Sequence, residues 1–224
     1  MTTMFDPIDA YCERTSPAYW AEPVNAVTNL AFLIAAVVMW RRTAGMPTGR
    51  VLSVVLAVIG VGSYLFHTHA HGLTALMDVL PILAFILLYL FAATRDLLGW
   101  RGLWPWAAVL GFFPYSVAAG AALGAVLPLA SSAAYAPIPP LILAYAWVVG
   151  RSHPRTGWGM ALGAVILIVS LTFRTLDEPL CDAWPLGTHF LWHILNALML
   201  GWMIEVWRRH ILAQARLAKA RARG

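Results

Sequence analysis

The chain contains seven runs of predominantly apolar residues, each near the roughly 20 residues that a helix needs to cross a bilayer. These runs constrain the fold most strongly, because a backbone inside hydrocarbon must satisfy its hydrogen bonds within the protein. They lack the alternation of apolar and polar residues that marks membrane-barrel strands. The predicted spans are residues 23–40, 51–67, 73–94, 103–122, 126–149, 157–174 and 187–207. The sequence therefore predicts an all-α fold, an integral membrane bundle of seven transmembrane helices.

The composition fits a membrane domain without a soluble partner domain. Only 11% of the residues are charged, against roughly 25% in soluble domains, and 61% are hydrophobic. The first sixteen residues lack the basic start and apolar stretch of a cleavable secretion signal, so the first span is expected to direct insertion. We expect residues 1–224 to form a single domain, with an acidic N-terminal segment at 1–22 and a basic tail at 208–224.

Prolines interrupt the fifth predicted span. Pro137, Pro139 and Pro140 lie inside residues 126–149. Because proline lacks a backbone donor and clashes with the preceding turn, this helix is expected to break or bend.

The basic residues predict the orientation of the bundle. All but two of the fifteen Lys and Arg residues fall in loops or tails on one side of the predicted bundle. The two exceptions are Arg14 and Arg174. Basic loops stay in the cytoplasm, so the N-terminus is expected to be extracytoplasmic and the C-terminus cytoplasmic. The net charge of +5 thus reflects topology and not a nucleic-acid partner, and the compact, Arg-rich chain suggests a bacterial inner membrane.

Five polar residues on three spans converge on the predicted extracytoplasmic side. Ser63 and His67 are four residues apart, as are His189 and His193, so each pair lies on one helix face. His67 ends the second predicted span and His189 begins the seventh at the same side. Asp78 enters from the third span, about a turn and a half below its outer end. Ionisable groups at membrane depth are costly, so their convergence predicts a functional site.

The residue types at this site indicate catalytic zinc. Three neutral imidazoles with an open fourth position are typical of a catalytic zinc ion, which lowers the pKa of bound water toward about 7. We expect His67, His189 and His193 to hold the metal, Asp78 to take the proton of the water, and Ser63 to stabilise the developing oxyanion. Taken singly, each histidine fits a structural interpretation better, as a polar residue hydrogen-bonded across the bundle or at the interface, and only their combination favours a metal site.

A second group of polar residues lies in the N-terminal segment. Asp9, Glu13 and Glu22 supply the oxygen ligands that Ca²⁺ prefers. A solvated acidic segment without bound metal remains the alternative.

The two cysteines, Cys12 and Cys181, both fall on the predicted outer side. In an oxidising compartment a disulfide between them would tie the N-terminal segment to the loop before the last span. Two free thiols remain the alternative, because a disulfide needs Cα atoms within about 7 Å.

Several motifs together resemble the alkaline ceramidase family, which belongs to a larger group of seven-span membrane hydrolases that includes adiponectin-type receptors. The resemblance covers nearly the whole chain, although Ala10 and a short Glu13–Glu22 segment depart from the family's pattern. Its carriers are Y-C-E at 11–13, E-P-V-N-A-V-T-N at 22–29, S-Y-L-F-H at 63–67, Asp78, and H-F-L-W-H at 189–193.

The resemblance implies a zinc ion on the three histidines, water near Asp78, an assisting Ser63, and Ca²⁺ near the three N-terminal acids. It also implies hydrolysis of the amide of ceramide to a sphingoid base and a fatty acid.

The predicted function is therefore a zinc-dependent intramembrane lipid amidase that acts on ceramide or a related N-acyl lipid. Two alternatives stay open at this stage. One is a non-enzymatic seven-span receptor or lipid-binding protein with a structural metal, and the other is a lipid esterase or phospholipase of the same superfamily. A metal transporter has little support, because the spans carry one shallow cluster and no second ionisable station.

Overall fold

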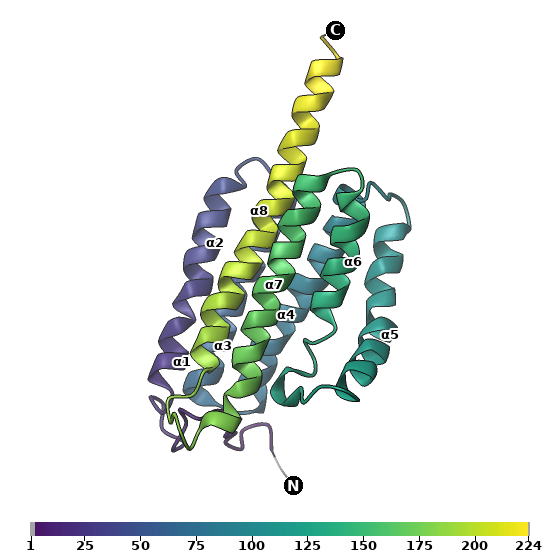
Figure 1. Cartoon of the computed structure of the whole chain (residues 1–224). Helices are drawn as coiled ribbons and strands as arrows, with labels where there is room; N and C mark the ends of the chain where they lie inside the picture. The colour runs from purple at the N-terminus through teal and green to yellow at the C-terminus, as the bar shows by residue number, and fades with distance from the viewer. Residues whose placement is uncertain (1–2, 224) are drawn as a thin grey trace.

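The computed structural model describes residues 3–223, and this part of the chain is helical. Its helices form one upright bundle from which the C-terminal helix protrudes (Figure 1). The α-helices are α1 (Pro23–Thr28), α2 (Leu30–Arg42), α3 (Pro47–His69), α4 (Gly72–Ala92), α5 (Trp104–Gly124), α6 (Ile138–Gly150), α7 (Pro154–Leu176) and α8 (His189–Arg221). Short elements are the π-helix η1 (Ala93–Leu97) and the 3₁₀ helices η2 (Ala130–Ser132) and η3 (Glu178–Leu180).

Six helical segments within the described residues are long and apolar enough to cross a membrane, which identifies an integral membrane protein. They are α1 with α2, α3, α4 with η1, α5, α7 and α8. These segments correspond to six of the seven predicted spans.

The span predicted at residues 126–149 is only partly helical. Residues 126–137 form turns and η2, and α6 has 13 residues, or about 20 Å of helix. The reason is the position of the prolines. Pro137 precedes the helix, and Pro139 and Pro140 fall in its first turn, where a missing N–H group costs no hydrogen bond. The prolines thus set the start of α6, and the sequence prediction placed this start too early.

Burial separates the central helices from the peripheral ones. In α3 and α8, 56% and 61% of the span residues are buried within the protein, against 6% in α5. The helix α8 packs against α2, α3 and α7, and α3 packs against α2 and α4. At Gly62 the backbone of α3 lies so close to the Met77 carbonyl of α4 that a side chain would clash. This close approach places Ser63 and Asp78 on neighbouring turns of two touching helices.

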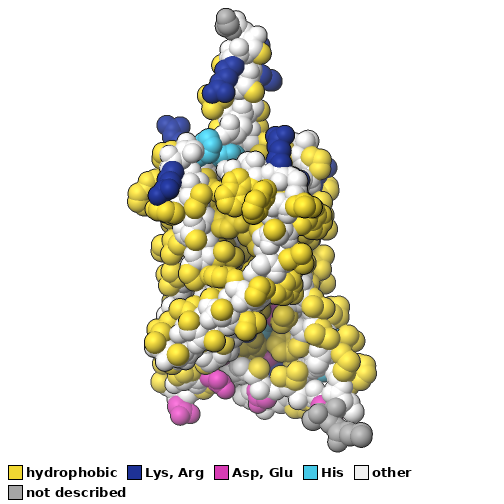
Figure 2. Space-filling model, turned by 90° about the vertical axis from the view of Figure 1, so that its right-hand side faces the viewer, with side chains coloured by type: hydrophobic (Ala, Val, Ile, Leu, Met, Phe, Trp, Pro, Cys, Tyr) yellow, Lys and Arg dark blue, Asp and Glu magenta, His cyan; other side chains and the backbone are white. Residues whose placement is uncertain are grey.

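The N-terminal segment closes the end of the bundle at which α8 begins. The Ile8 N–H donates to the Ala70 carbonyl (2.7 Å), and an isolated bridge pairs Pro7 with His71. On the face shown in Figure 2, the Asp and Glu side chains at the surface lie toward this end, and Lys and Arg gather at the end from which α8 protrudes.

Candidate metal centre

The structure brings together the three histidines that the sequence singled out. His67 lies in the last turn of α3, and His189 and His193 lie in the first two turns of α8. One ring nitrogen from each places the three ligand atoms within 4.8 Å of one another, and each residue is at most 1% exposed. In the described part of the chain this is the single group of its kind.

One ring nitrogen of each histidine has no hydrogen-bond partner. These atoms are Nε2 of His67, Nδ1 of His189 and Nε2 of His193. A buried polar atom left without a partner costs free energy, and a neutral imidazole nitrogen is a common metal ligand. The histidine trio, with an unpartnered nitrogen on each ring, therefore fits a shared metal ion, and an all-imidazole set suits zinc.

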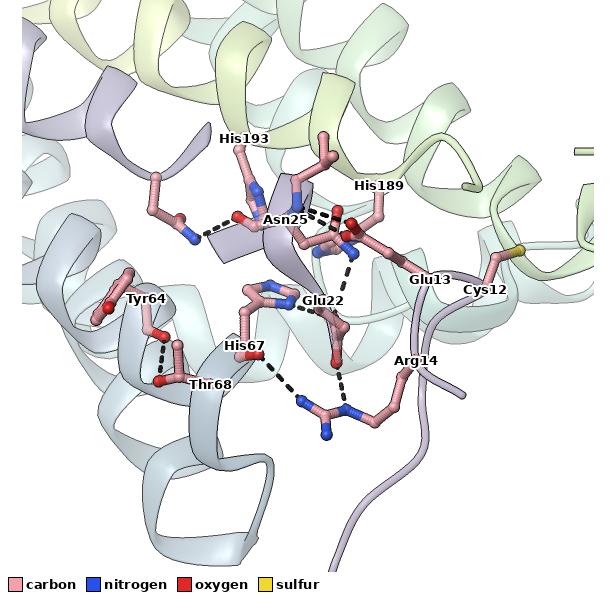
Figure 3. Close-up of polar contacts among 12 residues, drawn as sticks. Cys12, Glu13, Arg14, Glu22, Asn25, Tyr64, His67, Thr68, His189 and His193 are labelled. Atoms are coloured by element: carbon pink, nitrogen blue, oxygen red, sulfur yellow. Dashed lines mark hydrogen bonds and ion pairs between the residues drawn. The ribbon is translucent and has the colours of Figure 1, made fainter. Parts of the chain in front are cut away.

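Glu22 and Arg14 support His67 from the N-terminal segment (Figure 3). The Nδ1 atom of His67 lies 2.5 Å from Oε2 of Glu22, and Nε of Arg14 donates to the other Glu22 oxygen at 2.5 Å. Arg14 also donates to the His67 carbonyl at 3.0 Å. Because a hydrogen bond to the second ring nitrogen fixes the tautomer of a metal ligand, this pair holds His67 with Nε2 free.

The other two histidines are held by different contacts. Nδ1 of His193 lies 3.0 Å from the Thr28 hydroxyl, at the end of α1. The ring of His189 stacks on Tyr11, with 3.7 Å between ring centroids. Each ring is therefore positioned by the N-terminal part of the chain, within or before α1.

Asp78 and Ser63 lie beside this centre but outside the ligand group. Ser63 is 3% exposed and lies one turn before His67, and the Asp78 side chain is half-buried on α4. The Asp78 carboxyl lies within electrostatic reach of Arg174 and of the Ser63 hydroxyl. Tyr11, on the face of His189, lies within reach of Asp78 and Arg174. This arrangement places the Asp78 carboxyl group within reach of Ser63, Tyr11 and Arg174, and Asp78 is not part of the ligand group.

Arg174 is a site residue that the sequence analysis treated only as a topology marker. Its guanidinium carbon lies over the rings of Tyr11, Tyr135 and Trp192, at 5.8, 5.4 and 5.2 Å from their centroids. Its Nε donates to the Ser131 carbonyl at 3.2 Å. Arg14 and Arg174 are the two basic residues that the sequence places on the extracytoplasmic side, and both contact residues around the histidines. A basic residue on the wrong side was thus the available signal for both.

The structure does not bring Asp9, Glu13 and Glu22 into one ligand group among the described residues. Asp9 is exposed, and Glu22 is occupied by Arg14 and His67. The two oxygens of Glu13 accept from backbone N–H groups at the start of α1 (2.7 and 2.8 Å), which would otherwise lack partners. Burial raises the pKa of both Glu13 and Glu22. Calcium binding by these acids stays a prediction.

A disulfide and one aspartate fix the start of α8. Cys12 and Cys181 are joined, with their Cα atoms 5.1 Å apart. The buried Asp177 accepts from the Thr188 and His189 N–H groups (2.6 and 2.8 Å) and from the Cys12 N–H group (3.2 Å). Asp177 therefore positions the helix turn that carries His189. No short-range sequence pattern marks it, because its partners lie 11 or more residues away.

An apolar cavity lies in the bundle between α4, α6, α7 and α8, on the inner side of this centre. Tyr135 and Trp192 line it and also contact Arg174. Asn196 lines it one turn beyond His193, and Ile82 lines it one turn beyond Asp78. The cavity thus begins about one helix turn beyond the centre and is surrounded by side chains suited to hydrocarbon.

Comparison with known families gives one match. The family model of the ceramidases matches residues 9–220, which includes every residue of the centre described above. No curated protein matches the chain. Membership in this family implies an amide hydrolase that acts on ceramide. A match over nearly the whole chain shows that the protein belongs to the ceramidase family.

Proposed function

We propose that the protein is a zinc-dependent intramembrane lipid amidase that hydrolyses the amide of ceramide or a related N-acyl lipid. The observation that carries this proposal is the buried trio of imidazoles, each with an unpartnered ring nitrogen, which offers three ligand atoms within 4.8 Å of one another. Zinc held by His67, His189 and His193 would polarise the amide carbonyl and lower the pKa of water toward about 7. The absence of cysteine from the donor set favours a catalytic over a closed structural zinc ion.

The residues beside the histidines supply proton transfer and charge stabilisation. Asp78 accepts a proton from the attacking water and delivers it to the amide nitrogen as the C–N bond breaks. Ser63 donates a hydrogen bond to the carbonyl oxygen while that oxygen gains negative charge. The new C–O bond yields a fatty acid, and the protonated nitrogen leaves as the free amine lipid.

The apolar cavity accounts for the acyl chain of the substrate. Its lining by Ile82, Phe85 and Leu200 offers a hydrocarbon environment below the metal centre. Tyr135 and Trp192, held against Arg174, lie where the chain would pass from the centre into the cavity. The substrate then enters sideways from the bilayer and presents its amide to the histidines.

We further propose that the chain is one domain with seven membrane crossings, the fifth made by α6 together with residues 126–137. The N-terminus and the metal centre face away from the cytoplasm, in a bacterial inner membrane. The basic end from which α8 protrudes supports this orientation (Figure 2). The Cys12–Cys181 disulfide at the opposite end suits an oxidising compartment.

The test is a hydrolysis assay on purified protein whose zinc content has been measured. The protein is incubated with matched N-acyl and O-acyl lipids, with and without a strong chelator, and released products are identified by mass spectrometry. We expect fatty acid and free amine from N-acyl lipids, abolished by the chelator and restored by added zinc.

Release of fatty acid from O-acyl lipids alone would replace the amidase proposal by an esterase. Retention of zinc with no product from either class would point to a non-enzymatic lipid-binding protein.

A further inference from the structure

A surface groove between α2 and α8 lies outside the metal centre and its cavity. Its floor is formed by small residues, among them Ala35, Ala197 and Gly201, which leave a hollow between the two helices. Its apolar walls include Val38 and Leu198, which are 46% and 56% exposed. The groove is therefore open to the hydrocarbon of the surrounding membrane.

The basic end of the groove carries a set of arginines gathered around one buried glutamate. Glu205 accepts from Arg42 (3.0 and 2.8 Å), Arg208 (2.8 and 2.9 Å) and Arg209 (2.7 Å). One carboxylate thus faces three guanidinium groups, and the cluster keeps a net positive charge. Glu205 fixes the arginines in place but leaves several of their N–H groups without a protein partner.

Two of these arginines line the groove, so their positive charge lies at its end. Arg42 and Arg209 line it, and their side chains are 47% and 60% exposed. Arg209 also packs against the ring of Trp202, which lines the same groove, at 5.3 Å from the ring centroid. Guanidinium groups bind phosphate oxygens by paired hydrogen bonds and are preferred over lysine for this purpose.

The length of the groove matches one lipid leaflet. Its lining on α2 runs from Ala31 to Arg42, which is about 17 Å of helix at 1.5 Å per residue. Half of the hydrocarbon core of a bilayer is about 15 Å thick. An acyl chain that begins at the arginines would therefore extend along the groove to the middle of the membrane.

We propose that this groove binds an anionic phospholipid, with the phosphate on Arg42 and Arg209 and one acyl chain between α2 and α8. The net positive charge selects an anionic headgroup over a zwitterionic one, because a choline group would add a further cation beside the arginines. Glu205 acts as the positioning residue that orders the arginines before the lipid arrives. The site is independent of the hydrolytic reaction.

The test is native mass spectrometry of the detergent-purified full chain with phosphatidylglycerol or phosphatidylcholine of identical acyl chains. We expect phosphatidylglycerol to be retained and to raise the unfolding temperature more than phosphatidylcholine does. Substitution of Arg42→Gln or Arg209→Gln should each weaken phosphatidylglycerol binding about fivefold, and both together about twentyfold. The matched control is Arg41→Gln, because Arg41 is exposed on the same helix end and does not line the groove.

A second variant keeps the arginines and fills the groove. Leu198→Trp should lower phosphatidylglycerol retention although the charges are unchanged, and it decides the question if the double arginine variant does not fold. Glycerol phosphate, which has a headgroup but no acyl chain, should bind at least tenfold more weakly than the lipid.

Three results would overturn the proposal. They are equal retention of the two lipids, equal loss of binding in the Arg41→Gln control and the double variant, and a dimer that carries no phospholipid. The last result would assign the groove to a second copy of the chain.

Discussion

The two ends of the bundle each bury one glutamate paired with arginine, but they leave different groups unsatisfied. At the N-terminal end, Glu22 binds Arg14 and His67, and the buried atoms without partners are three imidazole nitrogens and the amide oxygens of Asn25 and Asn29. At the other end, Glu205 binds three arginines, and the groups in excess are guanidinium donors. Spare lone pairs suit a metal cation, whereas spare donors suit an anion. The contrast teaches that the leftover groups, and not the buried glutamate, indicate the ligand.

The largest expected effect separates a histidine of the centre from one at the opposite end. His193→Ala should remove zinc and lower turnover about a thousandfold or more, because metal polarisation supplies several kcal/mol of transition-state stabilisation. His153→Ala, in the loop before α7, should keep both zinc and turnover. Metal analysis and product release are measured on the two purified variants. Equal zinc content in both would contradict the zinc-binding role of His193.

The next effect concerns the carboxylates beside each cluster. Asp78→Asn should lower turnover by about 10² to 10⁴, the usual contribution of a general base, while zinc content is unchanged. Asp96→Asn removes a carboxylate that binds Arg95 and Trp207 at the basic end, and it should leave turnover intact. Undiminished hydrolysis by the Asp78→Asn protein would remove its proposed role.

A smaller effect compares the two buried glutamates directly. Glu22→Gln should weaken zinc binding by about 10-fold to 100-fold, because the residue that orients His67 loses its charge. Glu205→Gln should not change zinc affinity. Competition with a fluorescent zinc chelator gives both values. If the two substitutions weaken zinc binding equally, the loss of affinity comes from a general loss of folding and not from a lost orientation of His67.

The smallest effect concerns two arginines that contact aromatic rings. Arg174→Met should raise KM about tenfold with a smaller change in kcat, because Tyr135 and Trp192 lose the cation that holds them at the cavity entrance. Arg151→Met at the basic end, where Arg151 contacts Trp147, is the matched control and should leave KM unchanged. A fall in kcat at constant KM for Arg174→Met would assign this arginine to the chemistry and not to substrate entry.

The sequence predicted the histidine trio because the information that places it is local. Four-residue spacing on a helix puts two side chains on one face, and the hydropathy of the spans sets the depth of each pair. Six of the predicted spans were recovered for the same reason. In the span predicted at 126–149 the helix begins only at Ile138, because the prolines, and not the average hydropathy, control where α6 begins.

The support around the trio was not predictable from local patterns. Arg14 reaches the His67 carbonyl across 53 residues, and the Thr28 hydroxyl reaches His193 across 165. Glu22 was assigned to calcium from its residue type, its place near Asp9 and Glu13 and the family resemblance, whereas its contacts depend on how the N-terminal segment folds back under the bundle. The contacts of Asp177 likewise depend on the tertiary fold, because its hydrogen-bond partners come from two distant segments.

The most direct measurement is zinc X-ray absorption spectroscopy on the purified protein, with metal content determined on the same sample. We predict one zinc ion per chain, bound by three imidazole nitrogens, with loss of the histidine signal in the His67→Ala variant. A chain that binds no zinc after metal supplementation, or zinc whose histidine signal survives in that variant, would contradict a shared ion on His67, His189 and His193.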